Sequence, residues 1–445
     1  MAPDPDTIPR ATPDAARSRA FGLPAAVWLL GLGSLLNDTA SEAIYPLLPL
    51  FLTTVLGAGA FSLGVIEGGA EAANSLLKIF SGYFSDRWNM RRPVVVSGYA
   101  VASVARPFIA LIRSWPQLFL IRFVDRVGKG IRSAPRDAML AGWATPCTRG
   151  RVFGFHRAMD HVGAVLGPSL ATIFLLYQPG RYRLLFGLTV VPGLLAVLMV
   201  ALAREREAHT AASREHEGQT GAAREHEADT AAARGYVAQD FGPVLHRAPS
   251  FRPSALPARF YGYMAVLLLF TLGNSSDAFL LLRLSDAGVS AFWIPLLWAG
   301  LHVVKATVSV YGGNLSDRWS RRSVIGIGWA IYALVYGAFA VSQSITALVV
   351  WFLVYGVYYG FSEGVEKALV ADYAPAGLRG TAFGLYNAVI GLGALAASLV
   401  FGYVWTLAGP ASAFGMGAVL ALAATVALFA VIGRRPAEPE TEERS

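Results

Sequence analysis

The feature of this sequence that most constrains its fold is a succession of long apolar segments separated by short polar ones. About 20 apolar residues in a helix span the hydrocarbon core of a bilayer, which is about 30 Å thick. Six such segments precede residue 204 and six follow the next polar stretch, at 25–53, 61–84, 93–112, 115–141, 152–177, 184–203, 259–284, 290–313, 323–342, 346–370, 380–406 and 411–433. Hydrophobic residues make up 55% of the 445 residues, more than a soluble protein needs for its core. The sequence therefore predicts an all-α membrane protein with twelve transmembrane helices.

The distribution of arginine predicts how the helices are oriented. Short cytoplasmic connections are enriched in Lys and Arg. The even-numbered connections and the carboxyl-terminal tail carry Arg87, Arg91, Arg92, Arg149, Arg151, Arg318, Arg321, Arg322, Arg379, Arg434 and Arg435. The odd-numbered connections are nearly uncharged, and the polar first 20 residues lack the apolar core of a signal peptide. We expect both termini in the cytoplasm, and a multi-pass protein of the prokaryotic cytoplasmic (inner) membrane.

The two halves of the chain repeat one another. "FSGYFSDRWNMRR" at 80–92 recurs as "VYGGNLSDRWSRR" at 310–322, and a second related pair lies at 149–167 and 379–397. Two parallel six-helix repeats are typical of transporters whose halves rock about a shared substrate site. The predicted organisation is a cytoplasmic tail, a six-helix bundle, a cytoplasmic linker, a second six-helix bundle and a second tail, at 1–24, 25–203, 204–258, 259–433 and 434–445.

Three motifs make the chain resemble the major facilitator superfamily. The Gly, three residues, Asp-Arg and basic-cluster pattern of that family matches two sites, at Gly82, Asp86, Arg87, Arg91 and Arg92 and at Gly313, Asp317, Arg318, Arg321 and Arg322. A fourth-helix signature matches Arg122, Gly128 and Gly130. The fifth-helix G-x-x-x-G-P associated with antiporters matches Gly163, Gly167 and Pro168. The resemblance implies a pseudo-twofold secondary transporter that works by alternating access.

A row of charge on the fourth helix indicates a polar cavity. Arg122, Arg126, Lys129, Ser133 and Arg136 recur at spacings of three and four, and therefore share one face of a helix. A charge at mid-membrane costs about 2.5 to 3.5 kcal/mol, so these groups are expected to face water or partners. Acids are expected at matching depth on neighbouring helices, at Asp38, Glu42, Glu67, Glu71 and Asp160.

These acids are the candidates for coupling transport to protons. Asp38 and Glu42 lie one turn apart, and a partly desolvated carboxylate near Arg122 or Arg126 can load and release a proton. Permanent ion pairing is the alternative, and a position at the side of the cavity favours a structural role for Glu71. The coupling set is Asp38, Glu42, Glu71, Arg122 and Asp125.

Candidate substrate and gating residues complete the predicted site. An aromatic wall with a carboxylate on the tenth helix suits an organic cation, although ordinary helix packing explains it equally. The substrate set is Arg126, Lys129, Asp160, His161, Asp277, His302, Tyr355, Tyr359 and Glu363. The Asp-Arg loops at Asp86, Arg87, Asp317 and Arg318 are predicted to act as latches. Arg136 and Glu366, equivalent by the repeat, are predicted to form an inner gate.

Other chemistries find no support in the sequence. Cys147 is the single cysteine, and "RVGKG" lacks the spacing of a phosphate-binding loop. We expect no enzyme activity, no cofactor, no resident metal and no nucleic-acid partner. His209, His216 and His226 of the linker repeats are not spaced to bind a metal together. The preferred hypothesis is a monomeric, proton-coupled exporter of a cationic or amphipathic solute such as a drug or metal species. The second hypothesis is proton symport of an anionic solute or metal chelate, and the third is a membrane receptor or scaffold that does not transport.

Overall fold

Apolar, glycine-rich helices connected by short loops build the described part of the chain. The computed structural model describes residues 23–88, 90–144, 148–203, 256–375 and 378–431. Most of the predicted amino-terminal tail, the carboxyl-terminal tail, most of the linker and the linker histidines lie outside these residues. In the amino-terminal half the helices are α1 (Ala25–Ile44), the 3-10 turn η3 (Tyr45–Leu47), α2 (Leu48–Thr54), α3 (Ala60–Trp88), α4 (Arg91–Ala105), η4 (Arg106–Leu111), α5 (Trp115–Trp143), α6 (Arg149–Tyr177), α7 (Tyr182–Leu188) and α8 (Val190–Leu202).

The carboxyl-terminal half repeats this order with fewer breaks. Its helices are α10 (Ala258–Gly273), α11 (Ala278–Asp286), α12 (Trp293–Arg318), α13 (Arg321–Val341), α14 (Ile345–Tyr373) and α15 (Arg379–Val431). Gly409, with φ of +79°, breaks the helical path of α15 just before Pro410. This positive φ suits glycine, and Pro410 has no N–H to continue the ladder. The break coincides with the loop predicted between 406 and 411.

The described residues contain seven helical segments that are long and apolar enough to cross a membrane. They are Arg91–Leu111, Arg151–Tyr177, Tyr182–Leu202, Ala258–Asp286, Arg321–Val341, Ile345–Tyr373 and Thr381–Val431. Three of the long helices outside this set, α3, α5 and α12, carry charged residues along their length. The charges on α3 and α5 include those predicted to line a cavity, and charged residues lower the mean hydropathy of a helix. Passage of all twelve segments through the membrane stays a prediction.

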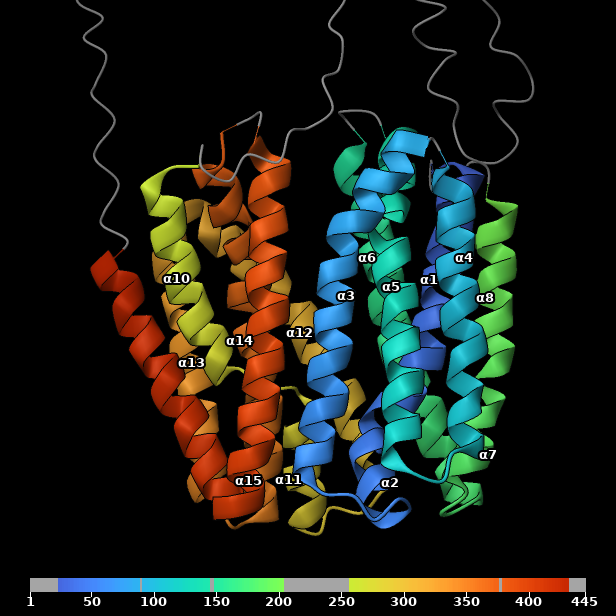
Figure 1. Cartoon of the computed structure of the whole chain (residues 1–445), viewed down its shortest axis with the longest axis vertical. Coiled ribbons are helices and arrows are strands. Elements are labelled where there is room, and N and C mark those ends of the chain that lie inside the picture. Colours follow the sequence, from blue (N-terminus) through green and yellow to red (C-terminus); the bar gives the residue numbers. More distant parts are fainter. Residues whose placement is uncertain (1–22, 89, 145–147, 204–255, 376–377, 432–445) are drawn as a thin grey trace, which may run out of the picture.

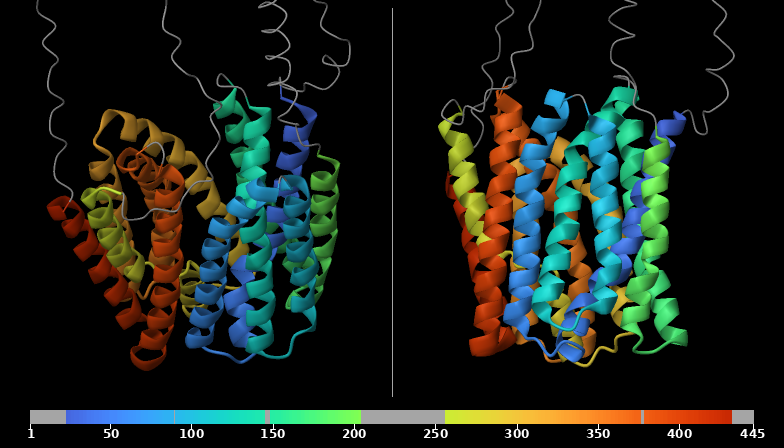
Figure 2. Two further views of the ribbon diagram at one scale, coloured as in Figure 1. Left: turned by 45° about the horizontal axis from the view of Figure 1, so that its top comes forward. Right: turned by 45° about the vertical axis from the view of Figure 1, so that its right-hand side comes forward.

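The two halves lie side by side as separate bundles. Figure 1 shows the amino-terminal half in blue to green beside the carboxyl-terminal half in yellow to red, and Figure 2 shows the same division from two more directions. Across the boundary α3 packs against α15, and α6 packs against α12. The start of α1, the end of α8 and the start of α10 lie at one face of the molecule, at the top of Figure 1.

The opposite face, at the bottom of Figure 1, is where the halves close on each other. There α2 contacts α11, and η3 contacts both α11 and α12. Phe51 and Leu52 of α2 are buried in the same apolar core as Leu280 and Leu281 of α11. One apolar core joins the halves at this end, and burial of such side chains from both bundles stabilises their contact.

Candidate functional site

A cavity of about 490 Å³ lies between the two halves and is lined by charged residues from both of them. Its walls come from α1, α3 and α5 on one side and from α10, α12, α14 and α15 on the other. The predicted site residues among its lining are Glu42, Glu71, Arg126, Lys129, Asp277, His302, Tyr359, Glu363 and Glu366. The lining extends to Glu363 and Lys367, whose side chains are 43% and 51% exposed. The cavity therefore reaches solvent at the end opposite α2 and α11.

The charged row on α5 divides between the cavity and the interior of its own half. Arg126 and Lys129 line the cavity. Arg122 turns away and donates to Glu67 of α3, with Nη2 to Oε1 at 3.0 Å. Arg136 donates to Ser34 of α1 at 3.3 Å and pairs with Asp137 at 3.1 Å. The middle of this helical face therefore lines the solvent-accessible cavity. The residues before and after it contact other helices of the same half.

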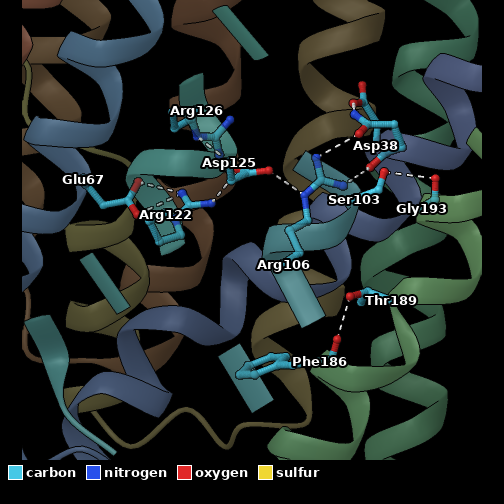
Figure 3. A network of polar contacts seen from close by, with 11 residues as sticks. Asp38, Glu67, Ser103, Arg106, Arg122, Asp125, Arg126, Phe186, Thr189 and Gly193 are labelled. Atoms are coloured by element: carbon cyan, nitrogen blue, oxygen red, sulfur yellow. Dashed lines mark hydrogen bonds and ion pairs between the residues drawn. The ribbon is translucent and has the colours of Figure 1, made fainter. Parts of the chain in front are cut away.

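A buried ionic network backs this wall, as Figure 3 shows. Asp125 accepts a hydrogen bond from Nε of Arg106 at 2.7 Å, and Arg122 and Arg126 approach the same carboxylate at 3.6 and 3.8 Å. Arg106 also donates to the side-chain oxygen of Asn37 at 2.8 Å. One carboxylate thus faces three guanidinium groups, so charges that would be costly alone compensate one another.

Sequence reasoning missed Arg106, although a signal was available. Arg106 starts η4 in the middle of an apolar segment, is 4% exposed, and links α1 to α5 through Asn37 and Asp125. An ionisable residue inside an apolar segment is a candidate for an interior partner by itself.

Asp38 lies behind the cavity wall and Glu42 lies in it. Asp38 accepts a hydrogen bond from the side chain of Asn37 at 2.9 Å and is not among the lining residues. Glu42 accepts a hydrogen bond from Nε1 of Trp298 on α12 at 2.8 Å, and Nε2 of His302 lies 4.0 Å from it. Of these two coupling candidates, Glu42 is therefore the one that connects the two halves.

The carboxyl-terminal wall is organised around Asp277. This carboxylate, which immediately precedes α11, accepts hydrogen bonds from Tyr355 and Tyr359 of α14, each at 2.8 Å. Nζ of Lys305 on α12 lies 3.4 Å from it and 3.5 Å from the centre of the Tyr359 ring. The structure thus brings together three predicted substrate residues, and it places an ammonium of the chain itself on the aromatic wall.

The remaining candidates lie away from this cluster. Asp160 of α6 accepts from Ser34 at 2.5 Å and has His156 3.6 Å away, within the amino-terminal half. His161 is not among the cavity-lining residues. Glu71 accepts from Asn74 and Ser75 on its own helix, at 3.1 and 3.2 Å.

Arg136 and Glu366, the predicted inner gate, make no contact with each other among the described contacts. Glu366 is buried against Trp329 and Tyr386, at 2.9 and 3.3 Å, while Arg136 is bonded within the other half. Because the cavity reaches solvent at this end, the inner gate that these two residues are predicted to form stays a prediction. Arg318 is exposed, and the side chains of Asp86, Arg87 and Asp317 lie outside the described residues. The described contacts instead show an ion pair between the halves, from Arg157 of α6 to Glu363 at 2.8 Å.

The sequence motifs imply two six-helix halves around a charged cavity. A comparison with a sequence model of a protein family shows which family this is. The model described as Major Facilitator Superfamily matches residues 30–303 and 288–445. The chain belongs to the major facilitator superfamily. It is accordingly a multi-pass membrane protein of a transporter family.

Relatives within the superfamily agree with this assignment. The chain is 32% identical over 404 residues to a protein of Methanocaldococcus jannaschii named "Uncharacterized MFS-type transporter MJ1317", covering 89% of this chain and 92% of the relative. It is 28% identical over 135 residues to the multidrug resistance protein MdtH of Photorhabdus laumondii, covering 30% and 33% of the two chains.

Solved structures of superfamily members share the fold. A D-xylose-proton symporter matches with a TM-score of 0.67 and 16% identity, covering 92% of this chain and 98% of that one. A POT family transporter in complex with 5-aminolevulinic acid matches with a TM-score of 0.71 and 11% identity, covering 92% and 96%. A bacterial homologue of the lysosomal transporter Spinster, inward-facing and unoccupied, matches with a TM-score of 0.65 and 18% identity, covering 91% and 94%. At these identities the likeness concerns the fold alone.

Proposed function

We propose that this superfamily member is a proton-coupled secondary transporter that moves a small charged solute through the central cavity by alternating access. The observation that carries the proposal is the contact between Glu42 and Trp298, which joins the halves at 2.8 Å. A protonated carboxyl group still accepts hydrogen bonds, but the indole N–H bonds more strongly to a charged carboxylate than to the neutral acid. Proton binding to Glu42 and closure of the halves through this contact therefore oppose each other.

Coupling of proton movement to transport requires that proton binding favour one arrangement of the halves over the other. A ligand shifts a two-state equilibrium only by binding the two states differently. Glu42 has Trp298 as a donor when the halves are closed at the α2–α11 end, and loses that donor when they separate there. A proton taken up in the separated state and released on closure gives a cycle in which a gradient drives rocking of the halves.

The orientation follows from the arginine distribution. We place both termini in the cytoplasm and all twelve segments in the prokaryotic inner membrane, with the monomer as the working unit. The cavity of the described structure then faces the cytoplasm, because it reaches solvent on the side of Glu363 and Lys367.

Two directions of transport have specific support. Exchange of protons for an outgoing cationic or amphipathic solute is favoured by the Gly163, Gly167 and Pro168 motif, and by the names of the partial MdtH relatives. Symport of an anionic solute is favoured by Arg126 and Lys129 in the cavity wall. A receptor that binds without transport is the remaining alternative.

Proton flux in proteoliposomes tests the proposal. Full-length protein with a pH dye inside the vesicles is offered pooled cationic and pooled anionic solutes, in wild type, Glu42→Gln, Asp38→Asn and the control Asp372→Asn. Asp372 pairs with Arg321 at 3.2 Å, away from the cavity. We expect one pool to drive proton movement that Glu42→Gln abolishes and Asp372→Asn preserves. Loss on Asp38→Asn alone would move the coupling role to Asp38, and absence of any flux would favour the receptor.

A further inference from the structure

The amino-terminal wall of the cavity carries three cations that make no ion pair shorter than 3.8 Å among the described residues. They are Lys78 of α3 and Arg126 and Lys129 of α5. The ionic contact recorded for Arg126 is 3.8 Å to Asp125, whose carboxylate is already held by Arg106 at 2.7 Å. For Lys78 and Lys129 the described contacts include neither a side-chain hydrogen bond nor an ion pair. Ammonium and guanidinium groups are donors only, so these groups have hydrogen-bonding capacity to offer a ligand.

These three cations also lie close to one another, which favours binding of an anion between them. Arg126 and Lys129 are separated by three residues and thus lie on one face of α5, where like charges repel each other. Gly130 of α5 packs closely on Asn74 and Leu77 of α3, which brings Lys78 to the same region of the wall. Glu71 of α3 lies in the same wall, and against its one negative charge the three positive groups leave an excess of positive charge that favours an anion.

The acids of the opposite wall, in contrast, already have partners. Asp277 accepts from Tyr355 and Tyr359 and pairs with Lys305. Glu366 accepts from Trp329 and Tyr386, at 2.9 and 3.3 Å. Their acceptor capacity is largely used within the protein, so they have less to offer to a cationic solute.

The other four acids of the cavity lining have hydrogen-bond or ion-pair partners as well. Glu363 pairs with Arg157 and Lys367, at 2.8 and 3.3 Å. Glu42 accepts from Trp298 at 2.8 Å, and Glu67 is paired with Arg122 at 3.0 Å. Glu71 has no cation within ion-pair distance among the described residues, but it accepts from Asn74 and Ser75.

The aromatic surface that would suit an organic cation holds a cation of the chain itself. Nζ of Lys305 lies 3.5 Å from the ring centre of Tyr359 and 5.3 Å from that of Trp298. An ammonium over an aromatic face gains the same attraction that a cationic substrate would gain there. A cationic solute would have to displace Lys305 from both the rings and Asp277.

We propose that the solute of this cavity is a small organic anion whose carboxylate, phosphate or sulfonate is bound by Arg126, Lys129 and Lys78. Its remaining part faces the aromatic wall that contains Phe270, Tyr358 and Tyr359. Guanidinium and ammonium groups bind such anions through short charge-assisted hydrogen bonds. This inference rests on the proposed function and names the substrate class for it.

The charge preference of the cavity can be measured without knowing the solute. Asn387 lines the cavity, and among the described contacts its side chain donates to the backbone carbonyl of Phe383 in the preceding turn. Asn387→Cys in a Cys147→Ser background therefore places a reporter thiol in the cavity. Its reaction rate is measured with an anionic reagent, 2-sulfonatoethyl methanethiosulfonate, and with a cationic one, 2-(trimethylammonio)ethyl methanethiosulfonate. The anion-to-cation rate ratio is compared with the ratio for free 2-mercaptoethanol.

We expect the ratio at this cysteine to exceed that of the free thiol by about tenfold or more, since a charged cleft concentrates opposite charge to that degree. Arg126→Gln and Lys129→Gln should each lower it. Arg126→Lys keeps the charge and should keep the ratio, which separates a charge effect from misfolding. Lys367→Gln is the matched control, because Lys367 lines the same cavity but is already paired with Glu363.

A ratio equal to or below that of the free thiol would overturn the inference, and so would a high ratio that Arg126→Gln and Lys129→Gln leave unchanged. Failure of the proposed function would look different. In that case the vesicles would show no solute-driven proton flux although the cavity cysteine still reacted preferentially with the anionic reagent.

Discussion

At the scale of single residues, Asp125 decides whether the interior of the amino-terminal half can hold its arginines. Its side chain is 2% exposed and compensates Arg106 directly and Arg122 and Arg126 at longer range. Asp125→Asn removes the negative charge and leaves those guanidinium groups uncompensated. Breaking a buried ion pair costs about 3 to 5 kcal/mol, so we expect a large fall in the thermal unfolding midpoint of the purified protein.

The matched control for that change lies three turns along the same helix. Asp137 pairs with Arg136 at 3.1 Å, but its side chain is 53% exposed. Exposed pairs contribute about 0 to 1 kcal/mol, so Asp137→Asn should shift the midpoint little. Equal shifts in the two variants would show that the network of Figure 3 does not stabilise this half.

At the scale of helices, the crossing of α1 and α6 depends on glycine. A Cβ atom at Gly163 would lie 2.5 Å from the carbonyl oxygen of Leu35, and one at Gly167 would lie 2.9 Å from the backbone nitrogen of Ala43. Small residues let helix backbones approach closely in membranes. We expect Gly167→Ala to lower the thermal unfolding midpoint and the rate of transport, because the two backbones must separate to admit the methyl group.

Gly154 of the same helix provides the control. Nothing lies within 4 Å of the position that its Cβ would take, so Gly154→Ala meets open space. Replacing glycine by alanine inside a helix stabilises it by about 0.5 to 1 kcal/mol when there is no clash. The midpoint should therefore stay unchanged or rise. A fall of the same size in both variants would refute the role given to close packing.

Helices were also the level at which sequence predicted most. The apolar segments predict most helix ends to within a few residues. They do so because the length and periodicity of an apolar segment depend only on neighbouring residues in the sequence. Side-chain partners were harder, since they depend on how helices rotate against each other. The spacing of the charged residues on α5 predicts that they form one wall of the cavity. In the structure, Arg122 instead donates to Glu67, while Arg126 lines the cavity. The pairing of Glu42 with Trp298 joins positions 256 residues apart and has no local signature.

At the scale of the whole molecule, Trp298 should affect the balance between molecules that are closed at the α2–α11 end and molecules that are open there. Its N–H bond to a carboxylate joins α1 and α12 beside the contact of Tyr45 with Ser276 at 3.3 Å. Trp298→Phe keeps an aromatic ring and removes the donor. A hydrogen bond to a charged group contributes about 1.5 to 3 kcal/mol, which corresponds to about tenfold or more in population.

Spin labels at Thr54 and Ser290, in a Cys147→Ser background, report on that balance, because these exposed positions lie in different halves at the α2–α11 end. Pulsed EPR on wild type should give one short distance, whereas Trp298→Phe should add a longer one from molecules that have opened there. Trp293→Phe, on the same helix but 52% exposed, should match wild type. If Trp298→Phe left the distance distribution unchanged, the closed end would be held by the apolar core of α2 and α11 and by the Tyr45–Ser276 contact. Proton binding at Glu42 would then have no means of driving the halves apart, so the same measurement bears on the coupling mechanism.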